Sequence, residues 1–153
     1  MKFIKGLWAT GLSVFSVMIL GGVPSVFYER GYDWLRSLQL PPFVMSKFLF
    51  LLTWCLVLLI MVCFLVCIII NKVPKKIYII LLAVSVIQIA GLILFFELKS
   101  IYSGLIASAA VVTLLGICFR LLGKYRYCNA LLFPYFTWVC YILTVNYCIV
   151  LLN

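Results

Sequence analysis

The residues best suited to chemistry in this sequence are large aromatic side chains set inside long apolar runs. Trp54 and Trp138 each lie about ten residues into such a run, well away from its ends. Indole rings that met there would line a flat, apolar cavity suited to a planar ring system. A large aromatic side chain can also simply fill space between helices, and the sequence leaves both interpretations open.

Two amide side chains, Gln88 and Asn146, also fall inside apolar runs. An amide is costly to bury in hydrocarbon, so each is expected to serve either a ligand or a structural hydrogen bond. Gln88 stands three residues after Ser85 and three before Gly91, a spacing that places them on one face of a helix. A second helical stripe comprises Tyr135, Trp138, Ile142 and Asn146.

Small hydroxyl and thiol side chains mark the same runs. A further stripe, at spacings of four, three and four residues, comprises Thr137, Tyr141, Thr144 and Cys148. For Ser85, Thr144 and Cys148 we expect hydrogen bonds between helices, because weakly polar side chains commonly bond across helix interfaces in membranes.

Conventional catalytic and metal-binding groups are missing from the sequence. There is no histidine, which removes the commonest general base, the commonest transition-metal ligand and the usual axial ligand of haem. None of the three acids, Glu29, Asp33 and Glu97, lies deep in an apolar run, so an ion-coupled transporter would have no intramembrane carboxylate. The seven cysteines form no CxxC pair and are expected to act as small hydrophobes. We predict no metal site and no conventional catalytic residue.

The elements that must position these residues are membrane-spanning helices. Of the 153 residues, 68% are hydrophobic and 10% charged, against roughly 45–50% and 25% in soluble domains. A chain of this length cannot hide so much apolar surface from water, which excludes a soluble enzyme and a free nucleic-acid-binding domain. The net charge of +9 is carried in short gaps between apolar runs, as topology signals are, so no nucleic acid partner is expected.

A helix needs roughly 20 apolar residues to cross the hydrocarbon, and the sequence offers five such runs in a single domain, residues 1–153. We predict helices over about 3–23, 43–71, 77–96, 101–122 and 129–151, with a mixed loop over 24–42. The remaining connections are short and favour antiparallel neighbours, so the predicted fold is an all-α integral membrane protein, a five-helix up-down bundle. The first run also fits a cleaved signal peptide, but its length and the lack of a small-residue cleavage site favour a helix.

Basic residues set the expected orientation in the membrane. The side of the N-terminus carries Lys2, Lys5, Lys72, Lys75, Lys76, Arg120, Lys124 and Arg126. The opposite side carries Arg30, Arg36, Lys47 and Lys99. By the positive-inside rule the N-terminus is cytoplasmic in a bacterial cell membrane, which we favour, with an organelle membrane as the alternative. Trp8, near a helix end, is expected to anchor at the membrane interface.

Four motifs follow one another along the chain. Residues 34–41 read WLRSLQLP, Trp54 stands in the second run, residues 95–100 read FFELKS, and residues 132–138 read LFPYFTW, with Asn146 and Tyr147 beyond. In this order they resemble W-Y-x-x-L-x-K-P, a second-helix tryptophan, F-F-G-L-R-S and L-x-P-Y-L-A-W…L-N-Y of the TspO/MBR family. Members of that family are also called translocator proteins, tryptophan-rich sensory proteins or peripheral benzodiazepine receptors.

The resemblance implies a five-helix bundle, commonly dimeric, with a pocket that opens near the first loop, so that loop 24–42 lies on the ligand side. Family members bind protoporphyrin IX, haem, sterols and synthetic isoquinoline or benzodiazepine-type ligands. It therefore implies a homodimeric membrane receptor or carrier for tetrapyrroles and other planar apolar molecules, in contact with the lipid bilayer. No cofactor is required, and porphyrin or haem is the expected ligand.

Two alternatives remain open at this point. Some bacterial members are reported to degrade porphyrin in light, and in such an enzyme Trp54 and Trp138 would be the electron or radical partners, the chemistry belonging mainly to the excited pigment. The other alternative is a structural protein that modulates a partner membrane protein.

Carried over residue by residue, the family's pocket falls on positions in the loop and in helices two, three and five. The implied ligand-binding residues are Trp34, Pro41, Trp54, Gln88, Gly91, Tyr135, Trp138, Ile142 and Asn146. Gln88 stands where the family usually has asparagine. In the loop, Arg36 or Arg30 could pair with the propionates of a tetrapyrrole.

The sequence departs from the family pattern at several positions. Gly91 replaces a large aromatic residue, which predicts a wider pocket on that side, and Ile142 replaces a small residue, which predicts a narrower one near helix five. Residues 45–46 (Met-Ser) replace a second Pro-Pro after Pro41. No basic residue follows Tyr147, so the sterol motif of helix five is incomplete and high-affinity cholesterol binding is not expected.

Overall fold

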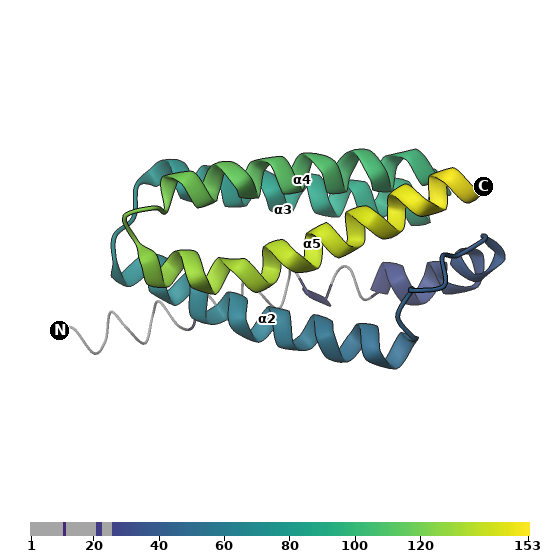
Figure 1. Cartoon of the computed structure of the whole chain (residues 1–153), viewed down its shortest axis with the longest axis horizontal. Coiled ribbons are helices and arrows are strands. Elements are labelled where there is room, and N and C mark those ends of the chain that lie inside the picture. The colour runs from purple at the N-terminus through teal and green to yellow at the C-terminus, as the bar shows by residue number, and fades with distance from the viewer. Residues whose placement is uncertain (1–10, 12–20, 23–25) are drawn as a thin grey trace.

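A computed structural model describes residues 11, 21–22 and 26–153, and this part of the chain consists of helices and turns. Four long helices, α2 (Lys47–Ile70), α3 (Lys75–Phe96), α4 (Ile101–Leu121) and α5 (Arg126–Leu152), run along the molecule (Figure 1). Each is long and apolar enough to span a membrane, which confirms the all-helical, integral membrane class. The predicted first helix, about 3–23, falls almost wholly outside the described residues, as does Trp8, so the fifth span stays a prediction.

The outer surface of the bundle is apolar, as contact with lipid requires. Leu59, Ile79 and Ile106 are each more than 60% exposed on the described helices. In water such surfaces would drive aggregation, whereas in hydrocarbon they cost nothing and the helices satisfy their own backbone hydrogen bonds. The helices are therefore apolar on all sides instead of on one stripe.

Close packing joins α3 to α4, α4 to α5, and α2 to α5. The turns between α3 and α4 and between α4 and α5 are short and produce packed antiparallel pairs, as predicted. The expectation fails for α2 and α3, which are also joined by a short turn but touch only beside it, where the Tyr78 hydroxyl donates to the Ile68 carbonyl at 3.0 Å. The buried face of α2 packs on α5 instead, so among the described helices α4 and α5 each pack against two neighbours.

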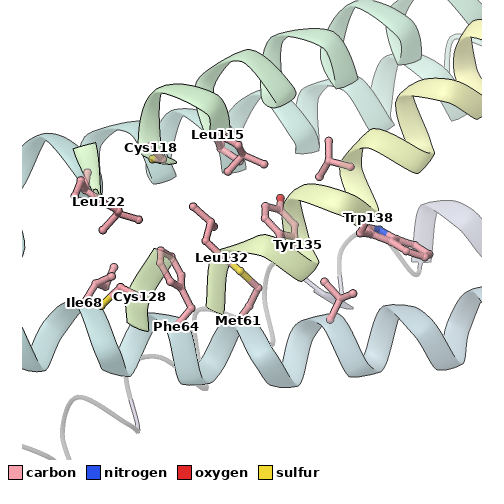
Figure 2. Close-up of a cluster of buried hydrophobic side chains, with 14 of the residues drawn as sticks. Met61, Phe64, Ile68, Leu115, Cys118, Leu122, Cys128, Leu132, Tyr135 and Trp138 are labelled. Atoms are coloured by element: carbon pink, nitrogen blue, oxygen red, sulfur yellow. The ribbon is translucent and has the colours of Figure 1, made fainter. Parts of the chain in front are cut away.

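The core lies where α2, α4 and α5 meet (Figure 2). Its fully buried side chains include Phe64 and Ile68 from α2, Leu115 and Cys118 from α4, Leu122 directly after α4, and Cys128 and Leu132 from α5. Tyr135 and Trp138 lie at one end of this cluster, one and two turns beyond Leu132 (Figure 2). The tightly packed core therefore determines where these two aromatic side chains project.

The predicted loop over 24–42 is in large part helical, because residues 26–37 form a helix. Tyr28 stacks on Phe50 with ring centroids 4.8 Å apart. Gly31 has no room for a side chain, since the ring of Phe96 occupies the place of a Cβ atom. Tyr28, Gly31 and Leu35 recur at intervals of three and four residues, a helical period that the charges and prolines of this segment obscured.

Helix α2 begins at Lys47, later than the predicted start at about residue 43. Ser46 caps it, because its side chain accepts a hydrogen bond from the Leu49 amide at 3.4 Å. Ser46 belongs to the Met-Ser pair that stands where the family has a second Pro-Pro, and it thus serves as a helix cap. The Met45 amide donates to the Tyr141 hydroxyl at 3.0 Å, which ties the approach to α2 onto α5.

Residues 26–46, hereafter the cap segment, are also held at the C-terminal end of α5. The Gln39 amide donates to Asn153 Oδ1 at 2.9 Å, and Asn153 Nδ2 donates to the Gln39 carbonyl at 3.1 Å. With the Tyr28–Phe50 stack and the Met45–Tyr141 bond, these contacts lay the cap segment across one end of the helix bundle (Figure 1).

Small residues allow α3 and α4 to approach closely. A Cβ atom at Gly91 would overlap the Cβ atom of Ala107 on α4. Small residues at helix interfaces in membranes let backbones come together and gain dispersion energy. The absent side chain at position 91 is therefore a packing requirement.

We expect Gly91→Ala to destabilise the protein by about 1–3 kcal/mol, because the added methyl group overpacks this interface. Gly116→Ala is the matched control on α4, since a Cβ there meets nothing within 4 Å, and the better helix propensity of alanine should leave stability equal or raise it by up to about 1 kcal/mol. Thermal unfolding in detergent or lipid measures both. Equal melting temperatures for the two variants would contradict the packing argument.

Candidate functional site

A cavity of about 170 Å³ lies under the cap segment, between α2, α3, α4 and α5. Most of its wall is aliphatic or aromatic, with residues such as Leu51, Leu92 and Val145 among aromatic side chains. Polar side chains are few and include the amides of Gln88 and Asn146 and the hydroxyl groups of Tyr28, Ser108 and Tyr141. A concave apolar site with a small number of polar groups is typical of small-molecule binding.

The two tryptophans expected to converge do so in this cavity. Trp54 of α2 and Trp138 of α5 both line it, with ring centroids 5.8 Å apart and planes tilted by 31°. Trp138 also contacts Phe50, at 5.0 Å between centroids, and Tyr141, at 5.7 Å. These four side chains, hereafter the aromatic wall, offer ring faces to one side of the cavity.

Gln88 provides a directional polar group opposite mostly apolar surfaces. Its Oε1 accepts a hydrogen bond from the hydroxyl of Tyr135, which joins α3 to α5. Within the part of the chain that the structure describes, its Nε2 has no hydrogen-bond partner, and the side chain lines the cavity. The amide can therefore donate to a ligand while Tyr135 holds its orientation.

Tyr135 itself does not line the cavity, although the sequence places it among the ligand-binding residues. Its side chain is buried, with 6% exposed, and its hydroxyl is engaged with Gln88. The structure therefore gives it a positioning role behind the wall.

Asn146 uses its amide group to join helices. Its Nδ2 donates to the Gly104 carbonyl at 3.0 Å and lies 3.4 Å from the hydroxyl oxygen of Ser108, both on α4. The sequence left a ligand contact and a structural bond open for this residue; the structure shows the structural bond, at a position that also lines the cavity. Ser108, which sequence reasoning missed, in turn donates to the Gly104 carbonyl at 2.7 Å.

Gly91 and Ile142 both line the cavity. The prediction that Gly91 widens the pocket is wrong, because Ala107 of α4 fills the space of the missing side chain. Ile142 follows Trp138 by one turn of α5 and adds an aliphatic side chain beside the aromatic wall.

Trp34 and Pro41 do not line this cavity. The indole of Trp34 packs edge-on against Phe95, with centroids 5.0 Å apart, and Phe95 in turn lines the cavity. Trp34 therefore supports the wall from outside. Pro41 lines a second, neighbouring cavity in the cap segment.

Sequence reasoning missed five aromatic lining residues, namely Tyr28, Phe50, Phe95, Phe96 and Tyr141. The signal for two of them was their helical spacing, since Phe50 lies four residues before Trp54 and Tyr141 three after Trp138. Tyr28 could be found only by recognising the helix over 26–37. Burial raises the pKa of Tyr28, with the nearby Tyr32 and Tyr141 adding to the shift, so it stays a neutral phenol at neutral pH.

The expected interhelical bonds of small hydroxyl groups are absent among the described residues. Ser85 donates to the Leu81 carbonyl and Thr144 to the Cys140 carbonyl, each at 2.9 Å within its own helix. The prediction is wrong for these residues because a carbonyl one turn back is always within reach of such a short side chain. Cys148 forms no hydrogen bond in the described part of the chain, and its thiol is half-buried.

Metal-ligating side chains do not gather in the described part of the chain: no three His, Cys, Asp or Glu residues lie close enough to hold an ion. The cavity wall includes no cysteine. Among the described lining residues, the side chains with an oxygen or sulfur suited to an axial haem ligand are Tyr28, Met45 and Tyr141.

We expect Tyr135→Phe to lower the free energy of unfolding by about 1–2 kcal/mol, because it removes the hydrogen bond to Gln88 and leaves the amide oxygen unpaired. Gln88→Leu removes the other partner. In a double-mutant cycle, the Tyr135→Phe/Gln88→Leu protein should be less destabilised than the sum of the single variants. Strict additivity in unfolding measurements would show that the bond contributes nothing.

The comparison with known protein families agrees with this architecture. The family model described as TspO/MBR matches residues 10–152, essentially the whole chain. The search of proteins with curated function finds no match. With its four apolar spans and the match over nearly its full length, the chain is an integral membrane protein that belongs to the TspO/MBR family.

Proposed function

We propose that this protein is a membrane receptor or carrier for planar hydrophobic ligands, with tetrapyrroles such as protoporphyrin IX and haem as the leading class. One observation carries the proposal: Trp54 and Trp138, from different helices, meet at 5.8 Å on the wall of an apolar cavity within the bundle. Family membership adds to it.

The aromatic wall would bind a flat ring by stacking and by exclusion of water or lipid. Aromatic pairs in offset or tilted geometry contribute about 0.5–1.5 kcal/mol beyond the area they bury. Gln88 would add one hydrogen bond to an acceptor on the ring, since its Nε2 has no partner among the described residues. The aromatic wall would favour flat ligands, and the amide of Gln88 would fix the orientation of the ligand in the cavity.

The size of the cavity requires a movement for the largest ligands. Its 170 Å³ is below the roughly 300–1,000 Å³ of ordinary drug-sized sites. The cap segment is the element we propose to move, because it covers the cavity and is held by separate contacts, such as the Met45–Tyr141 and Gln39–Asn153 bonds. A two- or three-ring ligand would need smaller adjustments than a macrocycle.

The chemistry of the wall favours recognition of the ring over recognition of iron. The chain has no histidine, and among the described lining residues an axial ligand would have to come from Tyr28, Met45 or Tyr141. A phenol or a thioether is a weaker axial ligand for iron than the histidine of most haem sites. We therefore expect metal-free protoporphyrin IX and haem to bind with dissociation constants within about tenfold of each other, since the ring supplies most of the contact.

Titration of protoporphyrin IX against intrinsic tryptophan fluorescence tests the proposal. Saturable quenching is expected for the wild type. Trp54→Phe and Trp138→Phe should each weaken binding by about three- to tenfold, because each loses part of the stacking surface. Tyr147→Phe is the control, since this aromatic residue of α5 is 53% exposed and does not line the cavity, and its affinity should equal that of the wild type.

Two results would overturn the proposal. One is the absence of saturable binding to a folded wild-type protein in detergent or lipid. The other is an unchanged affinity in the Trp54→Phe/Trp138→Phe double variant, which would place any bound porphyrin elsewhere.

Illumination of the same complexes tests the enzymatic alternative. Binding without chemistry predicts that pigment bleaches at the same rate with the protein as in a protein-free detergent control. A new absorbing product that forms only with protein, and is lost in Trp54→Phe or Trp138→Phe, would favour light-dependent degradation.

A further inference from the structure

A second cavity, of about 260 Å³, lies within the cap segment at the start of α2. It shares four lining residues with the aromatic cavity, namely Tyr28, Leu35, Val44 and Met45. The two cavities therefore adjoin, with these side chains at their boundary.

The second cavity is basic where the first is apolar. Arg36 and Lys47 line it, and no acidic residue does. Both cations also lie near the ring of Tyr32, with Arg36 Cζ at 5.8 Å and Lys47 Nζ at 5.0 Å from its centroid. The ring of Tyr32 thus attracts two positively charged groups at the second cavity.

One of these cations is already paired and the other is not. Lys47 Nζ lies 3.0 Å from Glu29 Oε1, in an ion pair whose side chains are 38% and 69% exposed. Within the described residues Arg36 forms no ion pair, although its guanidinium presents a fork of donors that matches a carboxylate. Arg30, the other arginine considered for this role, does not line the cavity.

We propose that this basic cavity binds a carboxylate carried by the same molecule whose flat, apolar part occupies the aromatic cavity. The ligand class is thereby narrowed to planar apolar acids. This inference rests on the proposed function, since it assigns the second end of that ligand. Arg36 receives the carboxylate, and Lys47 joins it by exchanging Glu29 for the incoming group.

The exchange at Lys47 makes Glu29 a competitor of the ligand. Both carboxylates bind the same ammonium group, and only Glu29 is present before the ligand arrives. Removing the charge of Glu29 should therefore strengthen the binding of an acid and leave the binding of a neutral analogue unchanged.

A matched pair of ligands tests the inference: protoporphyrin IX, which has two propionic acid groups, and its dimethyl ester, which has the same ring without the charges. Dissociation constants are measured by tryptophan quenching in nanodiscs of zwitterionic lipid. The readout is the dissociation constant of the ester divided by that of the acid, so a ratio above one means that the acid binds more tightly. Wild type should favour the acid. Arg36→Gln and Lys47→Gln should each lower this ratio by about two- to fivefold, as expected for a partly solvated ion pair.

Control variants separate this effect from a loss of folding or of general charge. Arg30→Gln removes one positive charge from the same helix but lies outside the cavity lining, and it should keep the wild-type ratio. Glu29→Gln should raise the ratio by about twofold, as expected for loss of an exposed competing pair. An unchanged affinity for the ester in every charge variant shows that the aromatic cavity is intact.

The outcomes distinguish the two proposals. If both ligands bind and the ratio is the same in wild type, Arg36→Gln and Lys47→Gln, the basic cavity does not bind the carboxylate and only this inference fails. If the ratio falls equally in Arg30→Gln, the effect is one of overall charge and the inference also fails. If neither ligand binds, the proposed function fails first.

Discussion

The packing of α5 between α2 and α4 is the interaction on which the whole site depends. One stripe of α5 sends Trp138 toward Trp54 of α2 and Asn146 toward Gly104 of α4. The same stripe sends the hydroxyl of Tyr135 to Gln88 of α3. Because these contacts fall on successive turns of one rigid helix, a shift of α5 would disturb the aromatic wall and both amide groups together.

The hydrocarbon environment bears on the Nε2 of Gln88, which has no hydrogen-bond partner among the described residues. An unsatisfied polar group in lipid costs several kcal/mol, so side-chain donors turn to the nearest carbonyl. Ser85 and Thr144 do this within their own helices, and Asn146 does it across to α4. Gln88 departs from this pattern within the described part of the chain, because its Nε2 belongs to a side chain that lines the cavity and is left free to donate to a ligand under the proposed function.

Much of this architecture follows from the sequence, because apolar length and tryptophan position are strong signals in membranes. The four described spans were predictable in this way, whereas the convergence of Trp54 and Trp138 and the lining positions of Gln88 and Ile142 were implied by the family resemblance. The helix over 26–37 was not predictable, since its charges, and the prolines at positions 24, 41 and 42 on either side of it, resemble a loop. The partner of Gly91 was also hidden, because a glycine shows in sequence only that space is needed and not which neighbour fills it.

The cap segment gives the two cavities a common wall, and this has a consequence for how a ligand enters. Leu35, Val44 and Met45 touch both spaces, so movement of the segment changes the apolar and the basic cavity at once. The hydrogen bond from the Met45 amide to Tyr141 couples the same boundary to the aromatic wall. Under the proposed assignment, a molecule that engages only the rings would leave the Lys47–Glu29 ion pair in place, whereas a molecule with an acidic group would replace this contact between α2 and the cap segment. The affinity for the ligand and the movement of the cap segment would then depend on the same acidic group of the ligand.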